Sequence, residues 1–384
     1  MDFGLSTDQQ DLHQAARAFA RAHLGPGAAE RAHDSGYPRD VARHLARQGF
    51  LGLTIPTARG GQGASLLDAV VVIEAIGSVC PRSADVVQAG NFGAVRTIAE
   101  LADDDLRARY LPGLLSGDTL VGLGMTEPEA GSAVTDLRTT VRRDGDAHVV
   151  LDGSKVFTTH SVEADLFLIY ARFGPGTAGI GSVLVERDTP GLSVGKPATF
   201  MSGEQWAPLY LDRCRVPAAN VLIAEGGFAR QMSTFNIERL GNAARSIALG
   251  QLAFDEAREH ATRRHQFGRP LCDFQGIQWM FADMALALES AQLVLHRAAA
   301  RADHGLPSAH DTALAKLAAN RAGFEVANTA MQVMGATGYT QESLVEYCVR
   351  RTRGWMIAGG STEILKNRIA EGIFDRRFSQ RSGR

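Results

Sequence analysis

Two acidic residues in the C-terminal half of the chain could take a proton from a substrate. Glu238 stands in the run Asn236-Ile237-Glu238-Arg239, where the sequence predicts the start of a long helix with Asn236 as its N-cap. A helix N-terminus lowers the pKa of a carboxyl group and burial raises it, so this site could hold an ionised base that gains strength once water is expelled. Positioned proton abstraction is typically worth about 10² to 10⁴-fold in rate. The alternative is a glutamate that complements the helix dipole and pairs with Arg239.

The second acidic residue, Glu363, follows Gly359-Gly360-Ser361-Thr362 at the predicted start of the last helix. Acids in the first turn of a helix complement the positive end of its dipole. We therefore expect a structural role for Glu363.

A basic stretch, Arg263-Arg264-His265, could hold phosphate. Arginine suits a pyrophosphate because its planar guanidinium donates two parallel hydrogen bonds. A solvated helix end is the alternative interpretation of the same stretch.

Three segments that differ in the spacing of their apolar residues must position these side chains. From Asp8 to about Gly117 the apolar residues recur at helical spacing, and from about Leu120 to Ile223 short β-prone runs alternate with Asp-Gly and Pro-Gly turns. Helical periodicity then returns, with long segments predicted at 236–262, 273–303 and 311–334. The β-prone runs include 148–151, 166–170 and 180–185. We therefore expect an α-helical domain over 1–119, a β domain over 120–229 and a second helical domain over 230–384.

Composition narrows the class of protein. The chain has 384 residues, 45% of them hydrophobic and 21% charged, which is ordinary for a globular protein with a substantial core. Its 40 basic and 42 acidic residues give a net charge of -2, which removes the broad electrostatic argument for binding nucleic acid or an anionic membrane.

The four cysteines, Cys80, Cys214, Cys272 and Cys348, lack zinc-ligand or CxxC spacing, so we expect reduced thiols and no metal site. No signal peptide is recognisable, and no stretch approaches the roughly 20 apolar residues of a membrane span. A cytoplasmic protein fits these features best. The glycine-rich runs at 60–63 and 335–338 do not follow strands, which argues against a Rossmann dinucleotide site.

Several motifs together resemble the acyl-CoA dehydrogenase family over essentially the whole chain. The run Gly124-Met125-Thr126-Glu127-Pro128-Glu129-Ala130-Gly131-Ser132 is similar to the signature at the entrance to that family's β domain. The run Arg264-His265-Gln266-Phe267-Gly268-Arg269-Pro270 is similar to its RxxFGxP motif. Further matches are Lys155-Val156-Phe157-Thr158-Thr159, 332–339, and Ile55-Pro56 before 60–63. The resemblance implies an α+β multidomain fold with an N-terminal helical domain, a central small β-barrel or sandwich and a C-terminal four-helix bundle.

The resemblance also implies FAD as cofactor. Hydrogen-bond donors such as Thr159 would stabilise charge on the flavin, and Phe157 would lie against its ring system, unless it simply fills the sheet core. The family holds the FAD phosphates and adenine across a subunit interface. The matching positions for all these contacts are Leu123, Met125, Thr126, Phe157, Thr158, Thr159, Arg264, Gln266, Phe267, Phe274, Gln275, Gln332, Gly335, Ala336, Ser361 and Glu363.

The chain departs from the family at the catalytic base. Gly359 stands where the family usually has the glutamate that takes the α-proton, and some branches keep this base at the position of Glu238 instead. The resemblance therefore predicts Glu238 as the base. Ala133 replaces a usual aspartate and Ala336 a usual glycine. The matching substrate contacts are Ser132, Asn236, Arg239 and Gly360.

The resulting hypothesis is an FAD-dependent enzyme of fatty acid metabolism that introduces an α,β double bond into an acyl thioester of CoA or of an acyl-carrier protein. Electron-transfer flavoprotein would accept the electrons, and the chain would form a homo-oligomer, a dimer or a tetramer. One alternative is a flavin-fold lyase that needs no α-proton base, since enzymes resembling 3-sulfinopropionyl-CoA desulfinase share the Ala-Gly-Gly loop. Another is a non-catalytic subunit that completes a partner's FAD site.

Overall fold

The computed structural model describes residues 4–302 and 306–380, and close contacts divide the chain into two units. The first, here the helical unit, comprises Met1–Ala32, Leu66–Ala84 and Asn236–Arg384. The second, the mixed unit, comprises His33–Ser65 and Asp85–Phe235. Both units are therefore built from segments that lie far apart in the sequence.

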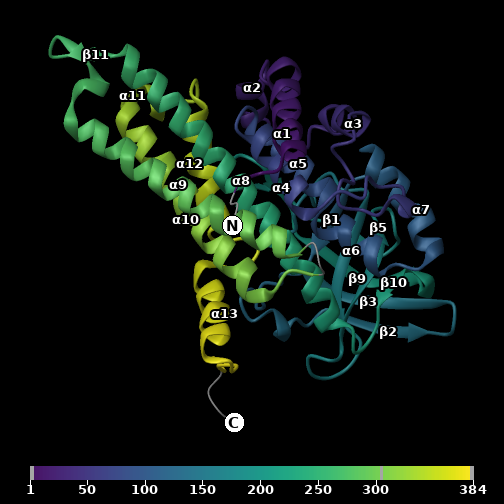
Figure 1. The fold of residues 1–384 in the computed structure, drawn as a ribbon. Helices are drawn as coiled ribbons and strands as arrows, with labels where there is room; N and C mark the ends of the chain where they lie inside the picture. The colour runs from purple at the N-terminus through teal and green to yellow at the C-terminus, as the bar shows by residue number, and fades with distance from the viewer. Residues whose placement is uncertain (1–3, 303–305, 381–384) are drawn as a thin grey trace. The chain divides into compact units, whose positions relative to one another are not determined.

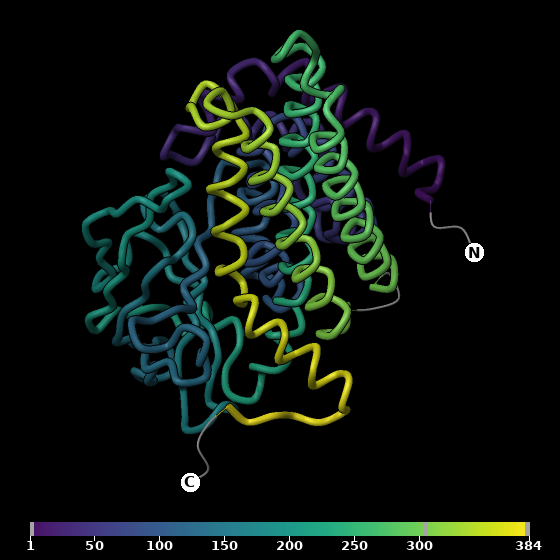
Figure 2. Tube along the Cα trace, turned by 90° about the vertical axis from the view of Figure 1, so that its left-hand side faces the viewer, coloured from purple at the N-terminus to yellow at the C-terminus, as the bar shows by residue number. Residues whose placement is uncertain are grey.

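Long helices that run side by side form the body of the helical unit, and Figures 1 and 2 both show α8, α9 and α10 along one another. Between α8 and α9 the chain forms a short hairpin of β11 (His265–Gln266) and β12 (Arg269–Pro270), at one end of these helices. The helices of this unit are α1 (Thr7–Phe19), α4 (Leu66–Gly77), α8 (Phe228–Arg263), α9 (Gln275–Arg301), α10 (Ala309–Met334), α11 (Ala336–Tyr339), α12 (Leu344–Trp355) and α13 (Thr362–Phe374).

Glycine lets α8 and α10 approach each other closely. A Cβ atom on Gly323 of α10 would lie 2.4 Å from the carbonyl oxygen of Ser246 on α8. A Cβ on Gly250 of α8 would lie 3.2 Å from the Cα of Gly323. A side chain at Gly323 would therefore push the two helices apart.

The mixed unit contains an eight-stranded sheet with the strand order β10-β5-β4-β2-β3-β9-β6, in which β1 pairs in parallel with β4. Its strands are β1 (Val121–Gly124), β2 (Thr140–Asp144), β3 (His148–Lys155), β4 (Leu166–Arg172), β5 (Ile180–Glu186), β6 (Leu192–Val194), β9 (Leu209–Pro217) and β10 (Val221–Ile223). A separate pair consists of β7 (Ala198–Thr199) and β8 (Gln205–Trp206). The helices are α3 (Arg39–Arg47), α6 (Gly93–Leu101) and α7 (Asp104–Ser116). Helices α2 (Ala28–His33), α5 (Pro81–Asn91) and α8 each cross a unit boundary.

Strand β4 separates two hydrophobic cores of the mixed unit. Its residues Leu166, Leu168 and Tyr170 pack in one core, together with side chains of α6 and α7. Phe167 and Ile169, which point to the opposite face, pack in the second core. Burial on both faces explains why this strand reads as a continuous apolar run in the sequence.

The predicted order of an α-helical, a β and a second α-helical segment is confirmed. Helices α1 to α7 precede residue 117, the strands of the sheet lie between residues 121 and 223, and long helices follow. The three β-prone runs singled out in the sequence are parts of β3, β4 and β5.

The expectation that Asn236 caps a helix is wrong. Helix α8 begins at Phe228, so Asn236 and Glu238 lie two turns or more inside it. Gly226 and Gly227 end the preceding segment, and residues 228–235 include no glycine or proline that would delay the helix. The helix dipole at an N-terminus therefore does not act on Glu238, because its effect fades within the first turn.

All four cysteines are free thiols, of which Cys80, Cys214 and Cys348 are buried and Cys272 is half-buried. Within the described ranges, 4–302 and 306–380, no helix combines the length and the hydropathy that a membrane span requires.

Candidate functional site

The loop that lacks the glutamate joins α12 to α13 and spans residues 356–361. Gly359 has φ = 70° and Gly360 has φ = 97°, in the left-handed region that glycine adopts without steric cost. The Ser361 side chain caps α13 by accepting a hydrogen bond from the N–H of Ile364. The loop is thus a sharp turn made by two glycines and ended by a helix cap.

Lys316 of α10 fastens this loop from the protein interior. Its Nζ donates hydrogen bonds to the carbonyl oxygens of Trp355, at 2.9 Å, and of Gly360, at 3.0 Å. The side chain is completely buried. A Cβ on Gly359 would lie 3.5 Å from Lys316 Cε, in ordinary van der Waals contact. The lysine therefore lies directly behind the position where the family usually has its glutamate.

Asn320, one helical turn after Lys316, provides a second and uncharged tether. Its Nδ2 donates to the Trp355 carbonyl at 2.7 Å, and its Oδ1 accepts from the hydroxyl of Ser246 at 3.0 Å. The two side chains of α10 thus share one acceptor at the end of α12.

The surroundings of Lys316 lower the pKa of its amine. The pKa of its amine is lowered to about 7, mainly by burial and less by the nearby charges of Arg239 and Arg245, while Glu238 acts to raise it. Glu238, which is half-buried on α8, is therefore close enough to act electrostatically on the amine that holds the loop. The candidate base and the glycine pair belong to the same small region of the helical unit.

Arg239 completes this region. Burial lowers the pKa of its guanidinium to about 10, with a smaller contribution from Arg368. Its Nη1 donates to Asn236 Oδ1 at 2.9 Å, and its Nη2 lies 3.6 Å from the position of a Cβ on Gly360. The predicted substrate residues Asn236, Arg239 and Gly360 are thus neighbours.

In the mixed unit, the two segments predicted to contact flavin lie side by side. The N–H of Val156 donates to the Thr126 carbonyl at 2.9 Å, and a Cβ on Gly124 would lie 3.6 Å from Thr158 Oγ1. Leu123, Met125 and Thr126 are half-buried and Thr159 is exposed.

Lys155 and Glu127 join these two segments by a buried ion pair. Lys155 Nζ lies 2.7 Å from Glu127 Oε1 and also donates to the Met125 carbonyl at 3.2 Å. Burial lowers the pKa of Lys155 to about 8, while the charge of Glu127 raises it. Burial acts to raise the pKa of Glu127, but Lys155 and the N–H groups of Arg138 and Thr139 lower it below its usual value.

Phe157 and Thr158 each present a group that a ligand could contact. Phe157 has φ = 55°, which is strained for a bulky side chain, and is 55% exposed, with its ring 4.4 Å from that of Trp206. The buried Thr158 Oγ1 has no hydrogen-bond partner. The alternative that Phe157 fills the sheet core is therefore wrong, and strain of this kind concentrates at ligand sites. An aromatic face beside an unused hydroxyl fits a flavin.

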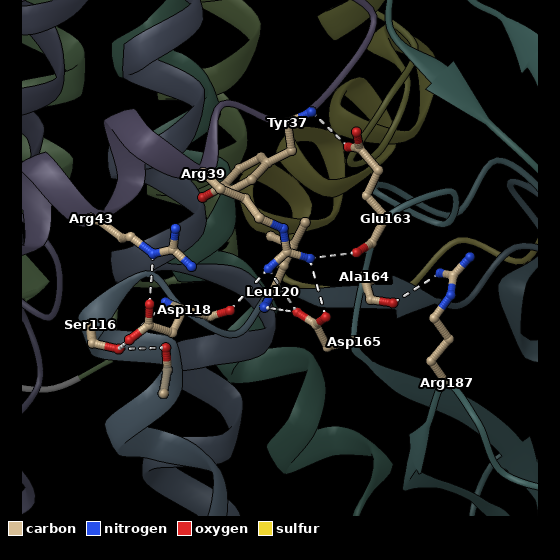
Figure 3. A network of polar contacts seen from close by, with 11 residues as sticks. Tyr37, Arg39, Arg43, Ser116, Asp118, Leu120, Glu163, Ala164, Asp165 and Arg187 are labelled. Atoms are coloured by element: carbon tan, nitrogen blue, oxygen red, sulfur yellow. Dashed lines mark hydrogen bonds and ion pairs between the residues drawn. The ribbon is translucent and has the colours of Figure 1, made fainter.

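A polar network fixes the turn that follows these residues (Figure 3). Arg39 of α3 binds both carboxylate oxygens of Asp165, at 3.0 and 3.2 Å, and the carbonyl of Glu163 at 2.7 Å. Asp165 in turn accepts from the N–H of Leu120 at 2.8 Å, just before β1. Arg187 adds a bond to the carbonyl of Ala164 at 3.0 Å. The network therefore anchors both candidate flavin segments to one another.

The residues predicted to bind the FAD phosphates and adenine lie on the helical unit. Phe267, at the tip of the hairpin, is 95% exposed and has φ = 52°. Arg264 and Met334, at the ends of α8 and α10, line one surface hollow of about 420 Å³. Arg264, Gln266, Gln275, Gln332, Gly335 and Ala336 are exposed, and Phe274 is half-buried.

Two predicted residues lie apart from these groups or have another role. Ser132 is exposed on the loop after β1. Exposed Glu363 has a pKa lowered by hydrogen bonds from its own N–H and from the hydroxyl of Ser361, which is the structural role that we expected for it.

Sequence reasoning missed Lys155 and Lys316 as structural centres of the two regions. The chain has only four lysines, Lys155, Lys196, Lys316 and Lys366, among 40 basic residues, so the other 36 are arginines. Lys316 stands among alanines and leucines in 313–318, where a charge is unexpected. That contrast is a signal that could have identified it.

Comparison with known proteins places this geometry in a family. The descriptions of the N-terminal, middle and C-terminal domains of acyl-CoA dehydrogenases match residues 6–118, 122–214 and 225–374. The chain is 36% identical to a 3-sulfinopropanoyl-CoA desulfinase of Paraburkholderia xenovorans, over 99% of each chain. It is 33% identical to a short-chain-specific acyl-CoA dehydrogenase of Clostridium acetobutylicum, over 97% of this chain and 100% of the relative.

Among solved structures, the glutaryl-CoA complex of glutaryl-coenzyme A dehydrogenase is similar, with a TM-score of 0.93 and 33% identity over 100% of this chain and 99% of that one. The motifs, the order of the elements and these matches agree. The chain therefore belongs to the acyl-CoA dehydrogenase family of FAD-dependent enzymes.

Proposed function

We propose that this protein introduces an α,β double bond into an acyl thioester, with Glu238 as the base that takes the α-proton. One observation carries the proposal: Arg239, the residue after Glu238 on α8, has its Nη2 3.6 Å from the position of a Cβ on Gly360 of the glycine loop. The carboxylate thus belongs to the region of the loop whose own position 359 is glycine. Abstraction of an α-proton needs such a base near the thioester.

FAD is the cofactor in this proposal. When bound, it supplies the acceptor for the hydride from the β-carbon. Phe157 and the hydroxyls of Thr158 and Thr159 would hold its ring system, and Arg264 would bind its pyrophosphate through paired N–H donors. Exposed Phe267 on its strained hairpin supports the view that this end is completed by a second copy of the chain, as in a dimer or tetramer.

The chain's own residues define the proton step. The carboxylate of Glu238 accepts the proton, and Asn236 and Arg239 on the same stretch of α8 line the substrate side. The electrons then pass to a protein acceptor, for which we propose electron-transfer flavoprotein. A solved structure described as the electron transferring flavoprotein of Acidaminococcus fermentans supports this kind of partner.

Anaerobic mixing of the FAD-loaded protein with a panel of acyl-CoAs tests the proposal through bleaching of the flavin. We expect the Glu238→Gln variant to bleach about 10² to 10⁴-fold more slowly, because the amide cannot accept the proton. The matched control is Glu325→Gln, which changes an exposed glutamate on α10. Equal bleaching rates in Glu238→Gln and the unchanged protein would remove Glu238 from the reaction.

A lyase is the second candidate, and the 36% identity with a desulfinase favours it specifically. A lyase of that kind needs no α-proton base, in keeping with glycine at position 359. Release of sulfite from a sulfinated acyl-CoA without flavin bleaching would select the lyase. Purification of the chain without any FAD would instead favour a non-catalytic subunit.

A further inference from the structure

A short hairpin of the mixed unit lies beside the candidate flavin segments. Its strands β7 and β8 pair over residues 198–199 and 205–206, and the chain then enters β9, which pairs with the end of β3 at Lys155. In the turn between β7 and β8, the N–H of Phe200 donates to the Glu204 carbonyl at 2.9 Å. The rings of Phe200 and Trp206 are stacked, with their centroids 6.0 Å apart and their planes at 28°. The β7–β8 hairpin therefore holds two aromatic rings together.

Both rings of this hairpin approach Phe157. The Phe157 ring lies 4.4 Å from that of Trp206 and 6.3 Å from that of Phe200, at tilted angles of 47° and 36°. Phe157 nevertheless stays 55% exposed, whereas Phe200 and Trp206 are half-buried. The hairpin thus supports Phe157 and leaves more than half of its surface open to a ligand.

The backbone conformation of Phe157 needs this support. Its φ of 55° lies in the left-handed region, which bulky residues rarely adopt. Such a conformation persists only where the surrounding structure holds it. Packing against Trp206, whose own position is fixed by the strand pairing of β8, supplies contacts of that kind. Without the indole ring we therefore expect Phe157 to leave this conformation.

A buried serine ties the β7–β8 hairpin to the turn after Phe157. The Ser161 hydroxyl accepts a hydrogen bond from the N–H of Ala207, directly after Trp206, at 2.7 Å. The N–H of Ser161 donates to the carbonyl of Thr158 at 3.2 Å. Thr158 is the residue whose buried hydroxyl has no hydrogen-bond partner within the described part of the chain. The hairpin, the Phe157 ring and this unused hydroxyl are therefore fixed relative to one another.

We propose that the β7–β8 hairpin clamps the ring system of the flavin, and that Trp206 is a positioning residue that holds Phe157 against it. The proposal rests on the contact between Phe157 and flavin in the proposed function, whereas the packing of Trp206 on Phe157 exists without any ligand. Through Phe157, Trp206 sets how long FAD stays bound and how well water is kept from its ring system.

Release of FAD from the loaded protein after dilution, followed by flavin fluorescence, tests the clamp without any turnover. We expect release to be about tenfold faster in Trp206→Ala, because the ring that holds Phe157 is lost. Trp206→Phe keeps an aromatic ring at this place and should stay within about twofold of the unchanged protein. The matched control is Tyr210→Ala, which removes an exposed aromatic side chain from β9 and should not change the release rate.

A double variant tests whether Trp206 acts through Phe157. If it does, adding Trp206→Ala to Phe157→Asn should speed FAD release by less than about twofold beyond Phe157→Asn alone. Multiplication of the two single effects would show that Trp206 supports the fold or the flavin independently of Phe157, and would overturn the proposal. If Trp206→Ala does not fold, Trp206→Leu replaces it, since leucine keeps apolar bulk without a ring.

The absorption spectrum of the bound flavin gives a second readout, because its bands depend on the polarity around the ring system. In Trp206→Ala we expect the spectrum to move towards that of free FAD in water. Trp206→Phe and Tyr210→Ala should retain the spectrum of the unchanged protein. A spectrum and a release rate that both stay unchanged in Trp206→Ala would contradict the clamp.

These measurements separate the clamp from the proposed reaction. Because they involve no turnover, failure of Glu238 as the base leaves them unaffected. Faster FAD release in Phe157→Asn but not in Trp206→Ala would keep the flavin contact of Phe157 and overturn the role of Trp206. Unchanged release in Phe157→Asn would remove that contact and the clamp together.

Discussion

Lys155 in the mixed unit and Lys316 in the helical unit are both completely buried, but they differ in what they bind. Lys155 contacts the carboxylate of Glu127 at 2.7 Å, and Glu127 also accepts from two backbone N–H groups. Lys316 donates to two backbone carbonyls, which carry no full charge. Burial accordingly lowers the pKa of Lys155 to about 8 and that of Lys316 to about 7.

The difference shows how a buried charge can serve two purposes. In the mixed unit, Glu127 neutralises the charge of Lys155 by direct contact. This ion pair therefore connects the two candidate flavin segments rigidly. In the helical unit the glycine at position 359 supplies no carboxylate, and the amine remains sensitive to Glu238. The first lysine is therefore expected to matter mainly for folding and the second mainly for the acid–base behaviour of the site.

The largest effect should come from breaking the ion pair of the mixed unit. Glu127→Leu leaves the ammonium of Lys155 buried without its counter-charge, so the free energy of unfolding should fall by about 3–5 kcal/mol. Urea unfolding measures this. Glu129→Gln is the control, since it breaks an exposed ion pair with Arg138, and should change the unfolding free energy by less than about 1 kcal/mol.

Replacing both partners sharpens the same test. The double variant Lys155→Met, Glu127→Leu removes both buried charges and should recover part of the stability lost in Glu127→Leu, because no unpaired charge remains. A double variant that is no more stable than the single one would mean that the hydrogen bonds of Glu127, and not its charge, brace the segments.

A change of intermediate size is expected from Lys316→Met, and it should depend on pH. The folded-state pKa of about 7 lies below the ordinary value of 10.5, so the unfolded chain binds more protons between these two values. Through this residue the unfolding free energy of the unchanged protein therefore rises from about pH 7 to about pH 10. The stability of Lys316→Met relative to the unchanged protein should be highest near pH 6 and decline towards pH 10. A constant difference across urea unfolding at pH 6, 8 and 10 would contradict this.

The smallest change in stability should follow replacement of Phe157, two residues after Lys155, by asparagine. Asparagine tolerates positive φ, and the relief of strain offsets the lost contact with Trp206, so the unfolding free energy should change by less than about 1 kcal/mol. The dissociation constant for FAD should nevertheless rise about tenfold, measured by flavin fluorescence. Unchanged FAD affinity would mean that the strained aromatic is not a ligand contact.

The family, the order of helical and β segments and the absence of a glutamate at position 359 can all be read from the amino-acid sequence, because motifs and hydrophobic periodicity are local properties of the chain. Sequence reasoning failed at the start of α8, where Asn236 looked like a cap although the preceding residues are equally able to be helical. The contact between Lys316 and Gly360 could not be read in this way, since the two residues are 44 positions apart along the chain and meet only in the folded protein. This contact depends on how α8, α10 and α12 pack. The close approach of α10 to α8 at Gly323 is one example, because it involves both helices and the sequence of either one does not reveal it.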